Sequence, residues 1–193
     1  MKRQPSRWIA VALVIAVTGA GVVVATQLRH TEETVFTPQA DTYVSTAHPD
    51  ANYGFKPNLR ADATPTIRSY LRFRLDGLSG RIIRAELRLW SRTGDLGGYS
   101  VHSVANTSWD EPRITSRNGP RTDGVVAKSG PFGPGSWSSV DVTRLVRASG
   151  DLNMALTTWS HQNVAFDSRE GVHKPKLVVQ TKPMSPTPTA TLG

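Results

Sequence analysis

The chain of 193 residues contains no cysteine. This absence excludes a disulfide framework, a zinc site with cysteine ligands, a thiol nucleophile and a lipid-modified cysteine. The five histidines are scattered, and no His-Glu-x-x-His or Gly-x-Ser-x-Gly motif is present. Asp110 and Glu111 adjoin in sequence, so on a strand they point to opposite faces and cannot flank a glycosidic bond as a catalytic acid pair does. The sequence therefore predicts a protein that is not an enzyme.

Long apolar runs are also scarce, with one exception near the N-terminus. Residues 8–28 are uncharged and rich in Ala, Val and Ile, and three basic residues precede them. A membrane-spanning helix needs about 20 apolar residues. We therefore expect residues 1–28 to form an N-terminal hydrophobic helix that acts as a signal anchor, or else a signal peptide cleaved near Val23-Val24-Ala25. Positive charge before the run predicts that the rest of the chain lies outside the cell, either secreted or anchored to the membrane.

The excess of basic residues is small outside this segment. The chain has 23 basic and 15 acidic residues, a net charge of +8. Four of the basic residues and none of the acidic ones fall within residues 1–29, so 19 and 15 remain, a net charge of +4. Nucleic-acid-binding domains usually concentrate basic residues in a stripe or patch. We therefore expect no nucleic-acid partner, whereas an acidic polysaccharide is compatible with this charge.

Alternating polarity predicts an all-β fold. In Ser69–Leu75, Leu71, Phe73 and Leu75 share one face, and residues 85–90 alternate in the same way. Gly- and Pro-rich turns separate many such short runs, which is typical of an antiparallel β-sandwich. The one helical turn is expected at 141–147, capped by Asp141 or Ser139. Further strands are expected near residues 41–46, 58–62, 99–105, 124–128, 136–141, 153–159, 162–167 and 175–181.

Composition divides the chain into four parts. The hydrophobic segment 1–28 is followed by a short polar stalk at 29–35 and by the β-sandwich domain at 36–181. Residues 182–193 are rich in Pro and Thr. Such a segment cannot build a core, and we expect it to be disordered.

An ordered series of short segments runs through the expected domain. In chain order they are Ala40–Val44, Asn52–Gly54, Leu59–Asp62, Ser69–Phe73, Ile83–Leu89, Ser108–Glu111 with Ile114-Thr115, Trp137 with Val140–Thr143, Phe166–Gly171 and Lys174–Val179. Together they resemble the family-96 carbohydrate-binding module, also called the DNRLRE domain. The resemblance implies a jelly-roll β-sandwich that binds polysaccharide, with acidic glycans among the plausible ligands.

The chain departs from the family pattern at two places. It has Phe73-Arg74-Leu75 where the family usually has Phe-Asp-Leu, and Ile114-Thr115-Ser116 where the family often has Ile-Thr-Trp. The second change removes a tryptophan that serves the family as a core side chain or as a stacking surface. Both changes bear on the ligand more than on the fold.

Sugar recognition uses flat aromatic rings and planar hydrogen-bonding groups, and Arg pairs with the carboxylate of an acidic sugar. By their pattern, Tyr53, Tyr70 and Trp90 are the aromatic residues expected to be exposed. If strands 67–75 and 84–90 pair as a hairpin, Tyr70 and Trp90 share one face with Arg72 and Arg88. Otherwise these residues are the solvated outer face of a sandwich. The candidate carbohydrate-binding residues are Asn52, Tyr53, Arg60, Tyr70, Arg72 and Arg169.

Other roles remain open for the charged residues. Arg169 and Glu170 form either a ligand-binding pair or an ion pair that fixes the last strand, with Asp41 or Asp62 as partner. Asp41, Asp62, Asp110 and Glu111 could together supply oxygen ligands to a structural calcium ion. No other cofactor is expected. The alternative function is a structural or adhesion module of the cell envelope that contacts protein or peptidoglycan.

Overall fold

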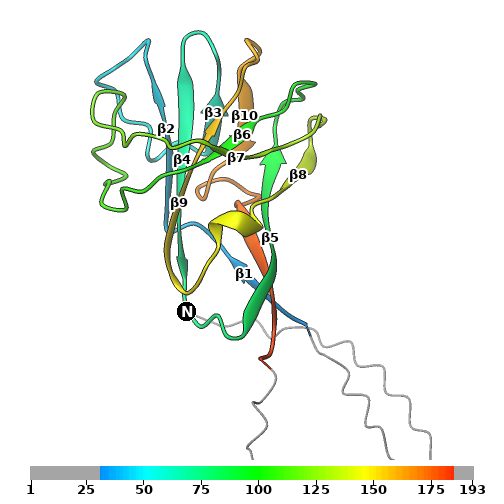
Figure 1. Ribbon diagram of the computed structural model, residues 1–193. Coiled ribbons are helices and arrows are strands. Elements are labelled where there is room, and N and C mark those ends of the chain that lie inside the picture. Colours follow the sequence, from blue (N-terminus) through cyan, green and yellow to red (C-terminus); the bar gives the residue numbers. More distant parts are fainter. Residues whose placement is uncertain (1–30, 185–193) are drawn as a thin grey trace, which may run out of the picture.

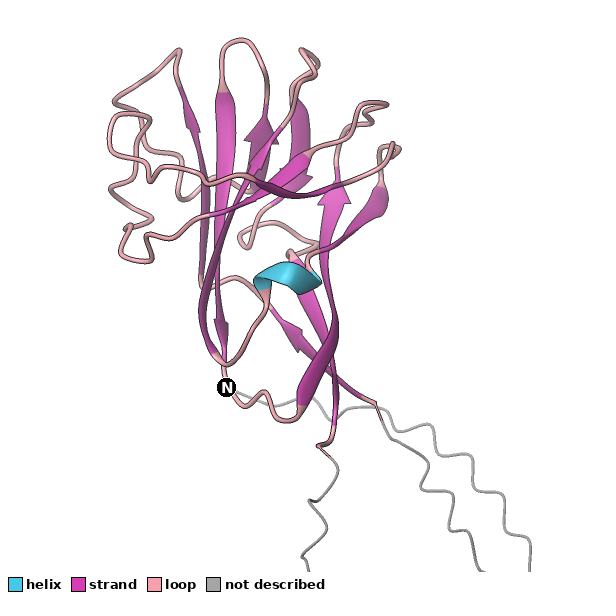
Figure 2. Ribbon diagram, in the orientation of Figure 1, coloured by secondary structure: helices cyan, strands magenta, loops and turns pink. Residues whose placement is uncertain are grey.

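The computed structural model describes residues 31–184, which form eleven strands and one short 3₁₀ turn (Figures 1 and 2). The predicted hydrophobic helix at 1–28 lies outside the described residues. Within residues 31–184, no helix is long and apolar enough to cross a membrane. The strands are β1 (Glu32–Phe36), β2 (Ala40–Ser45), β3 (Asn58–Ala61), β4 (Ile67–Leu75), β5 (Arg81–Ser91), β6 (Ser100–Ser103), β7 (Val125–Lys128), β8 (Ser136–Asp141), β9 (Gly150–Thr157), β10 (Val164–Asp167) and β11 (Lys176–Lys182).

The strands form two sheets in which every pair is antiparallel. The first sheet has the order β1-β11-β5-β10-β3, and β8 also pairs with β5. The second has the order β2-β4-β9-β6-β7. We call them sheet A and sheet B, and Figure 1 shows them facing each other across the core. The all-β sandwich predicted from alternating polarity is confirmed.

The core lies between the two sheets, where the predicted alternation places the apolar side chains. Leu71, Phe73 and Leu75 of β4 point inward from sheet B and are buried. Leu87 and Leu89 of β5 meet them from sheet A. Each fully buried side chain of this size contributes about 1.5–3 kcal/mol relative to exposure to water. One continuous apolar layer therefore joins the two sheets.

A second, smaller core lies on the outer face of sheet B. The segment 104–124 connects β6 to β7 and folds back over this face, on the left of Figure 1. Its Trp109 and Ile114 pack with Tyr70 of β4 and with apolar residues of β2 and β9. Tyr70 is only 1% exposed as a result. The expectation that Tyr70 is exposed was wrong, because a distant segment covers the face to which it points.

The conditional prediction of a β4–β5 hairpin is also wrong. β4 belongs to sheet B and β5 to sheet A, so the turn at 76–80 crosses from one sheet to the other.

The predicted helical turn is present as a 3₁₀ turn at Thr143–Leu145, and the Asp141 carboxylate accepts a hydrogen bond from the Thr143 amide (2.9 Å). In the segment expected to be a stalk, Glu32–Phe36 forms β1 and pairs with β11, so sheet A begins at Glu32.

Candidate functional site

Asn52, a predicted sugar ligand, joins two loops of the domain. Its side-chain amide donates to the carbonyl oxygens of Glu111 and Ile114, both at 2.7 Å. Its own oxygen accepts from the Gly54 amide at 3.1 Å. A Cβ at Gly54 would lie 2.5 Å from the Glu111 carbonyl oxygen, so glycine is required for the close approach. Asn52 is therefore occupied in holding the 46–57 loop against the segment 104–124.

Tyr53 and Arg60 gather around Tyr43 of β2. The Tyr53 ring stacks on the Tyr43 ring with centroids 4.2 Å apart. The Arg60 guanidinium carbon lies 5.6 Å from the Tyr43 centroid, and Arg60 Nε donates to Asn163 Oδ1 at 2.8 Å. Both predicted residues are half-buried. They form a small aromatic and cationic group around Tyr43.

Tyr70 and Arg72 hold the segment 104–124 onto sheet B. The Tyr70 hydroxyl donates to the Pro120 carbonyl at 2.8 Å. Arg72 Nη1 donates to the Trp109 carbonyl at 2.8 Å, and its guanidinium lies 5.0 Å from the Trp109 ring centroid. A guanidinium over an indole is a favourable cation–π contact. The contacts of both side chains are thus with the protein itself.

Arg169, the last predicted binding residue, is the centre of an ion-pair network. Its Nε and Nη2 donate to Glu111 Oε1 (3.0 Å) and Oε2 (2.6 Å), a bidentate arrangement. Its Nε also lies 2.9 Å from Glu170 Oε1. Its backbone amide donates to Asp41 Oδ2 at 2.8 Å. The ion-pair role left open for Arg169 is what the structure shows, with Glu111 and Glu170 as its carboxylate partners.

Asp41, Glu111 and Glu170 form a cluster, which we call the acidic cluster. One carboxylate oxygen from each lies within 4.8 Å of the corresponding oxygens of the other two, a spacing that would suit a metal ion. Two other residues considered for calcium lie apart from it: Asp62 accepts from the Thr64 amide, and Asp110 faces Arg113. Of the four residues considered for calcium, the structure brings together Asp41 and Glu111, and Glu170 takes the third place in the cluster.

Asp41 is buried, with 1% of its surface exposed. Burial raises its pKa to about 8, and the nearby carboxylates of Glu170 and Glu111 add to the rise, whereas the Arg169 amide opposes it. The Asp41 Oδ1 atom has no hydrogen-bond partner among the described residues. The ionised form of Asp41 is therefore poorly stabilised by the other residues of the described chain.

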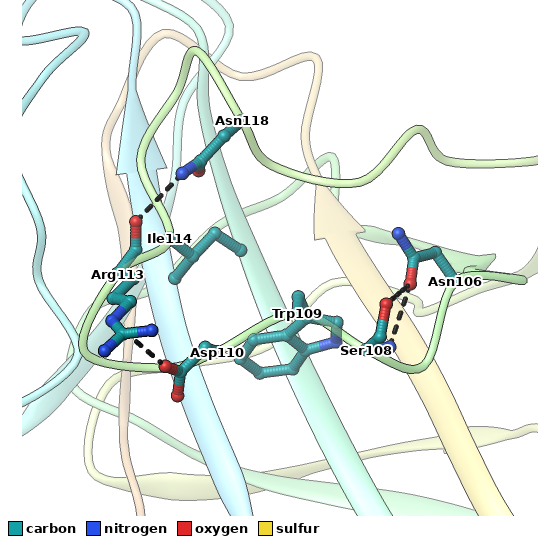
Figure 3. A pocket seen from close by; sticks show the side chains of 7 residues that line it. All are labelled: Asn106, Ser108, Trp109, Asp110, Arg113, Ile114 and Asn118. Atoms are coloured by element: carbon teal, nitrogen blue, oxygen red, sulfur yellow. Dashed lines mark hydrogen bonds and ion pairs between the residues drawn. The ribbon is translucent and has the colours of Figure 1, made fainter.

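A cavity of about 220 Å³ lies within the segment 104–124 (Figure 3). Many of its polar groups already bond to each other. Asn118 donates to the Arg113 carbonyl (3.0 Å), and Ser108 donates to Asn106 (2.7 Å). Pockets that enclose a small ligand usually measure about 300–1,000 Å³. This cavity is therefore a poor candidate for a sugar chain. Its lining residues are Asn106, Ser108, Trp109, Asp110, Arg113, Ile114 and Asn118.

Aromatic rings gather on the outer face of sheet A. Trp90 of β5 and Trp137 of β8 are directly paired across the strands, and their rings meet edge to face at 5.5 Å. The His173 ring stacks on Trp90 at 4.0 Å. The Lys176 ammonium lies 4.7 Å from the Trp137 centroid. We call these four residues the tryptophan cluster. Trp137 is 38% exposed, so the cluster presents an aromatic surface to solvent.

The charges around the tryptophan cluster are mainly positive. Lys176 has no carboxylate within ion-pair distance among residues 31–184. Arg88, its neighbour on β5, is paired with Glu86 at 2.7 Å. His173 is held by Asp167, whose Oδ2 lies 3.0 Å from His173 Nδ1. Within residues 31–184, an ammonium group that has no carboxylate partner thus lies beside the exposed indole.

None of the four residues of the tryptophan cluster is among the predicted carbohydrate-binding residues, although Trp90 was expected to be exposed and Trp137 belongs to the segments that resemble the family. Trp90 was expected to be exposed from the alternation of residues 85–90. Trp137 lies on a strand that alternates in the same way, Ser136–Asp141, so its outward direction could have been inferred. Local patterns do not give the order of strands in a sheet. They therefore could not show that β8 lies beside β5 or that the His173 ring stacks on Trp90.

The comparisons with known proteins bear on function. A search of curated proteins found no match. The model for carbohydrate-binding module family 96 matches residues 32–181, nearly all of the described domain. Proteins of such a family bind carbohydrate and generally do not catalyse a reaction. The tryptophan cluster and the sandwich architecture agree with this assignment, and the chain belongs to carbohydrate-binding module family 96.

Proposed function

We propose that this protein binds a polysaccharide outside the cell, without catalysis, through the tryptophan cluster. The observation that carries the proposal is the exposed Trp137 ring beside Trp90 on the outer face of sheet A. An indole offers a large, rigid and flat apolar surface with an N–H at its edge. The apolar C–H face of a pyranose ring fits such a surface, and its hydroxyl groups remain in water at the rim.

The charges favour an acidic glycan. The Lys176 ammonium lies over the indole of Trp137 and has no carboxylate partner in the described part of the chain. Lys174 is also exposed, on the connection between β10 and β11, two residues before Lys176. A sugar carboxylate next to the stacked ring would find these ammonium groups at its edge, and charge-assisted bonds are stronger than neutral ones. We therefore expect uronate-containing polysaccharides to bind more tightly than neutral ones.

Affinity gel electrophoresis tests the proposal. The full chain, purified in mild detergent, is run through gels that contain alginate, polygalacturonate or a neutral glucan. We expect retardation in the uronate gels. Trp137→Ala should weaken binding by about 10-fold or more, because truncating a central aromatic residue of a binding surface typically costs about 2 kcal/mol or more. The same gels detect any release of oligosaccharide product, which is not expected.

Trp159→Ala is the matched control. Trp159 is 84% exposed on the connection between β9 and β10 and makes no aromatic contact within residues 31–184. Its loss leaves binding unchanged if the tryptophan cluster is the site. Equal binding by Trp137→Ala and the wild-type chain, with unchanged thermal melting, would contradict the assignment of the site.

The location of the domain is part of the proposal. It follows from the basic residues that precede the apolar run 8–28. Protease added to intact cells should remove the domain if it is anchored, whereas a cleaved form should appear in the medium. Retention of the domain inside intact cells, protected from protease, would contradict this location.

The alternative function is a structural or adhesion module of the cell envelope. The observation that favours it is a set of large apolar side chains exposed on loops, namely Phe55, Leu96, Trp159 and Val172. Exposed apolar groups are a feature of protein-binding surfaces when they are contiguous. A domain that binds none of the glycans but binds peptidoglycan or an envelope protein, and loses that binding in Trp159→Ala, would support this alternative instead.

A further inference from the structure

The acidic cluster has more negative than positive charge. Three carboxyl groups converge there, from β2, from the segment 104–124 and from the connection between β10 and β11. The positive group among them is the Arg169 guanidinium, which binds both oxygens of Glu111 and also contacts Glu170. With all three carboxyl groups ionised, one guanidinium leaves two negative charges uncompensated.

The imbalance is greatest at Asp41. This residue is 1% exposed, and one of its oxygens accepts from the Arg169 amide. The other, Oδ1, has no hydrogen-bond partner in the described chain. A buried charged group without a partner is strongly unfavourable, and nearly all such groups in folded proteins are satisfied. When Asp41 is ionised, its unpartnered oxygen favours a further positive group at this position.

We propose that the acidic cluster binds one calcium ion. The ligand groups are all carboxylate oxygens, which calcium prefers. Calcium–oxygen distances are about 2.3–2.6 Å, so two ligands of one ion can lie up to about 5 Å apart. The 4.8 Å spread of the three carboxylate oxygens fits this limit. A charge of +2 also balances the excess of the cluster.

The three carboxylates have different roles in this site. Asp41 is the buried ligand, and its Oδ1 gains the partner it lacks. The Glu170 side chain is more open to solvent, so water can complete the coordination on that side. Arg169 stays bound to Glu111 and reduces the affinity by repulsion. We expect a dissociation constant of about 10⁻⁴–10⁻³ M, the range of extracellular calcium modules.

This inference goes beyond the proposed function and is tested without any glycan. The full chain in mild detergent, freed of metal with a chelator, is titrated with calcium chloride while thermal unfolding and heats of binding are followed. Binding only to the folded state raises the Tm. For a dissociation constant near 1 mM, 10 mM calcium should raise it by about 3–6 °C. Magnesium at the same concentration should have less effect, because it demands a smaller, octahedral site.

Variants locate the ion. Asp41→Asn should abolish the calcium-dependent rise in Tm, and Glu170→Gln, which changes a more accessible side chain, should weaken binding by about 10-fold. Asp76→Asn is the control, because Asp76 is exposed and lies outside the acidic cluster; it should keep the full rise. If Asp41→Asn does not fold, Glu170→Gln alone decides.

Three outcomes would overturn the proposal. In the first, calcium gives no heat of binding and no rise in Tm beyond that of sodium chloride at equal ionic strength. In the second, the rise persists in both Asp41→Asn and Glu170→Gln. In the third, Asp76→Asn removes the rise as fully as Asp41→Asn does.

Discussion

Asp167 organises the rim of the tryptophan cluster. Its buried carboxylate accepts bonds from Arg92 Nε and from the His173 backbone amide (2.9 Å), and it holds the His173 ring at 3.0 Å. Burial alone would raise the pKa of Asp167, but these bonds together lower it below its ordinary value of 3.8. The His173 ring that lies on Trp90 is thus fixed by a carboxylate that is itself almost fully buried.

A pH dependence follows from this carboxylate. Because its pKa is lower in the folded than in the unfolded chain, its stabilising effect is complete above about pH 4 and is lost as the pH falls through the lowered pKa. Asp167→Asn should reduce the free energy of unfolding at pH 7 by about 1–3 kcal/mol and flatten its acid decline. Urea unfolding at pH 7 and pH 3 measures both effects.

Asp76→Asn is again the control, since this exposed residue should change the free energy of unfolding by less than about 0.5 kcal/mol. An equal loss in both variants, or an acid decline as steep in Asp167→Asn as in the wild-type chain, would show that the Asp167 bonds do not stabilise the fold.

The exposure of single residues was only partly predictable from the sequence. Alternation correctly gave the direction in which Trp90 and Tyr70 point, outward from their sheets. It did not give what lies over them. Tyr70 is covered by Trp109, which is distant in sequence, whereas Trp90 is covered only partly, by His173. The pattern of one strand carries no information about a loop that folds back from another part of the chain.

Among the elements, the segment 104–124 behaves as a part of the core although it contains no strand. Trp109 is buried against Tyr70, and its Nε1 donates to Asn153 Oδ1 at 2.8 Å. Arg72 adds a cation–π contact from β4. The segment therefore seals one face of sheet B, which explains why the exposed aromatic surface is found on sheet A instead.

The stability of this cover can be measured. Trp109→Ala should lower the free energy of unfolding by about 3–5 kcal/mol, because it removes a large buried ring. Trp109→Phe keeps most of the ring but leaves Asn153 without its donor, and should lower it by about 1–3 kcal/mol. Trp159→Ala removes an exposed ring of the same type and should have little effect. Equal unfolding free energies in Trp109→Ala and Trp159→Ala would contradict a core role for the segment.

Most of the strands were predictable, because each has its own alternation and turn signals. The predicted strands at 58–62, 136–141 and 175–181 agree closely with β3, β8 and β11. β1 was missed because Glu32–Phe36 is polar at its start and has one neighbour, β11, at the edge of sheet A. The sheet to which each strand belongs was not predictable from local pattern, as β4 and β5 demonstrate.

For the whole molecule, the family could be recognised from the ordered segments, but the candidate site could not. Asn52, Tyr70, Arg72 and Arg169 belong to recognisable segments, yet each bonds within the protein. A residue can recur in a family because it holds the fold. The tryptophan cluster instead depends on β8 and on the connection between β10 and β11 meeting over β5, an arrangement that only the three-dimensional structure reveals.

The pairing of β1 with β11 has a mechanical consequence. Glu32 faces Thr181 and Phe36 faces Leu177, so both ends of the described chain leave the domain at the same end of one strand pair, at the bottom of Figure 1. Tension applied between Thr31 and Met184 would load these hydrogen bonds one after another, in an unzipping geometry. Tension between Thr31 and Lys174, which lies just before the opposite end of β11, would load all the β1–β11 hydrogen bonds at once, in a shear geometry.

Single-molecule pulling compares the two attachments. We expect β1 to detach at a clearly lower force with handles at Thr31 and Met184 than with handles at Thr31 and Lys174. Equal forces would show that the β1–β11 pair does not bear the load. A domain held at both ends of its chain would thus yield first at this edge, while the sheet beneath the paired indoles stays intact.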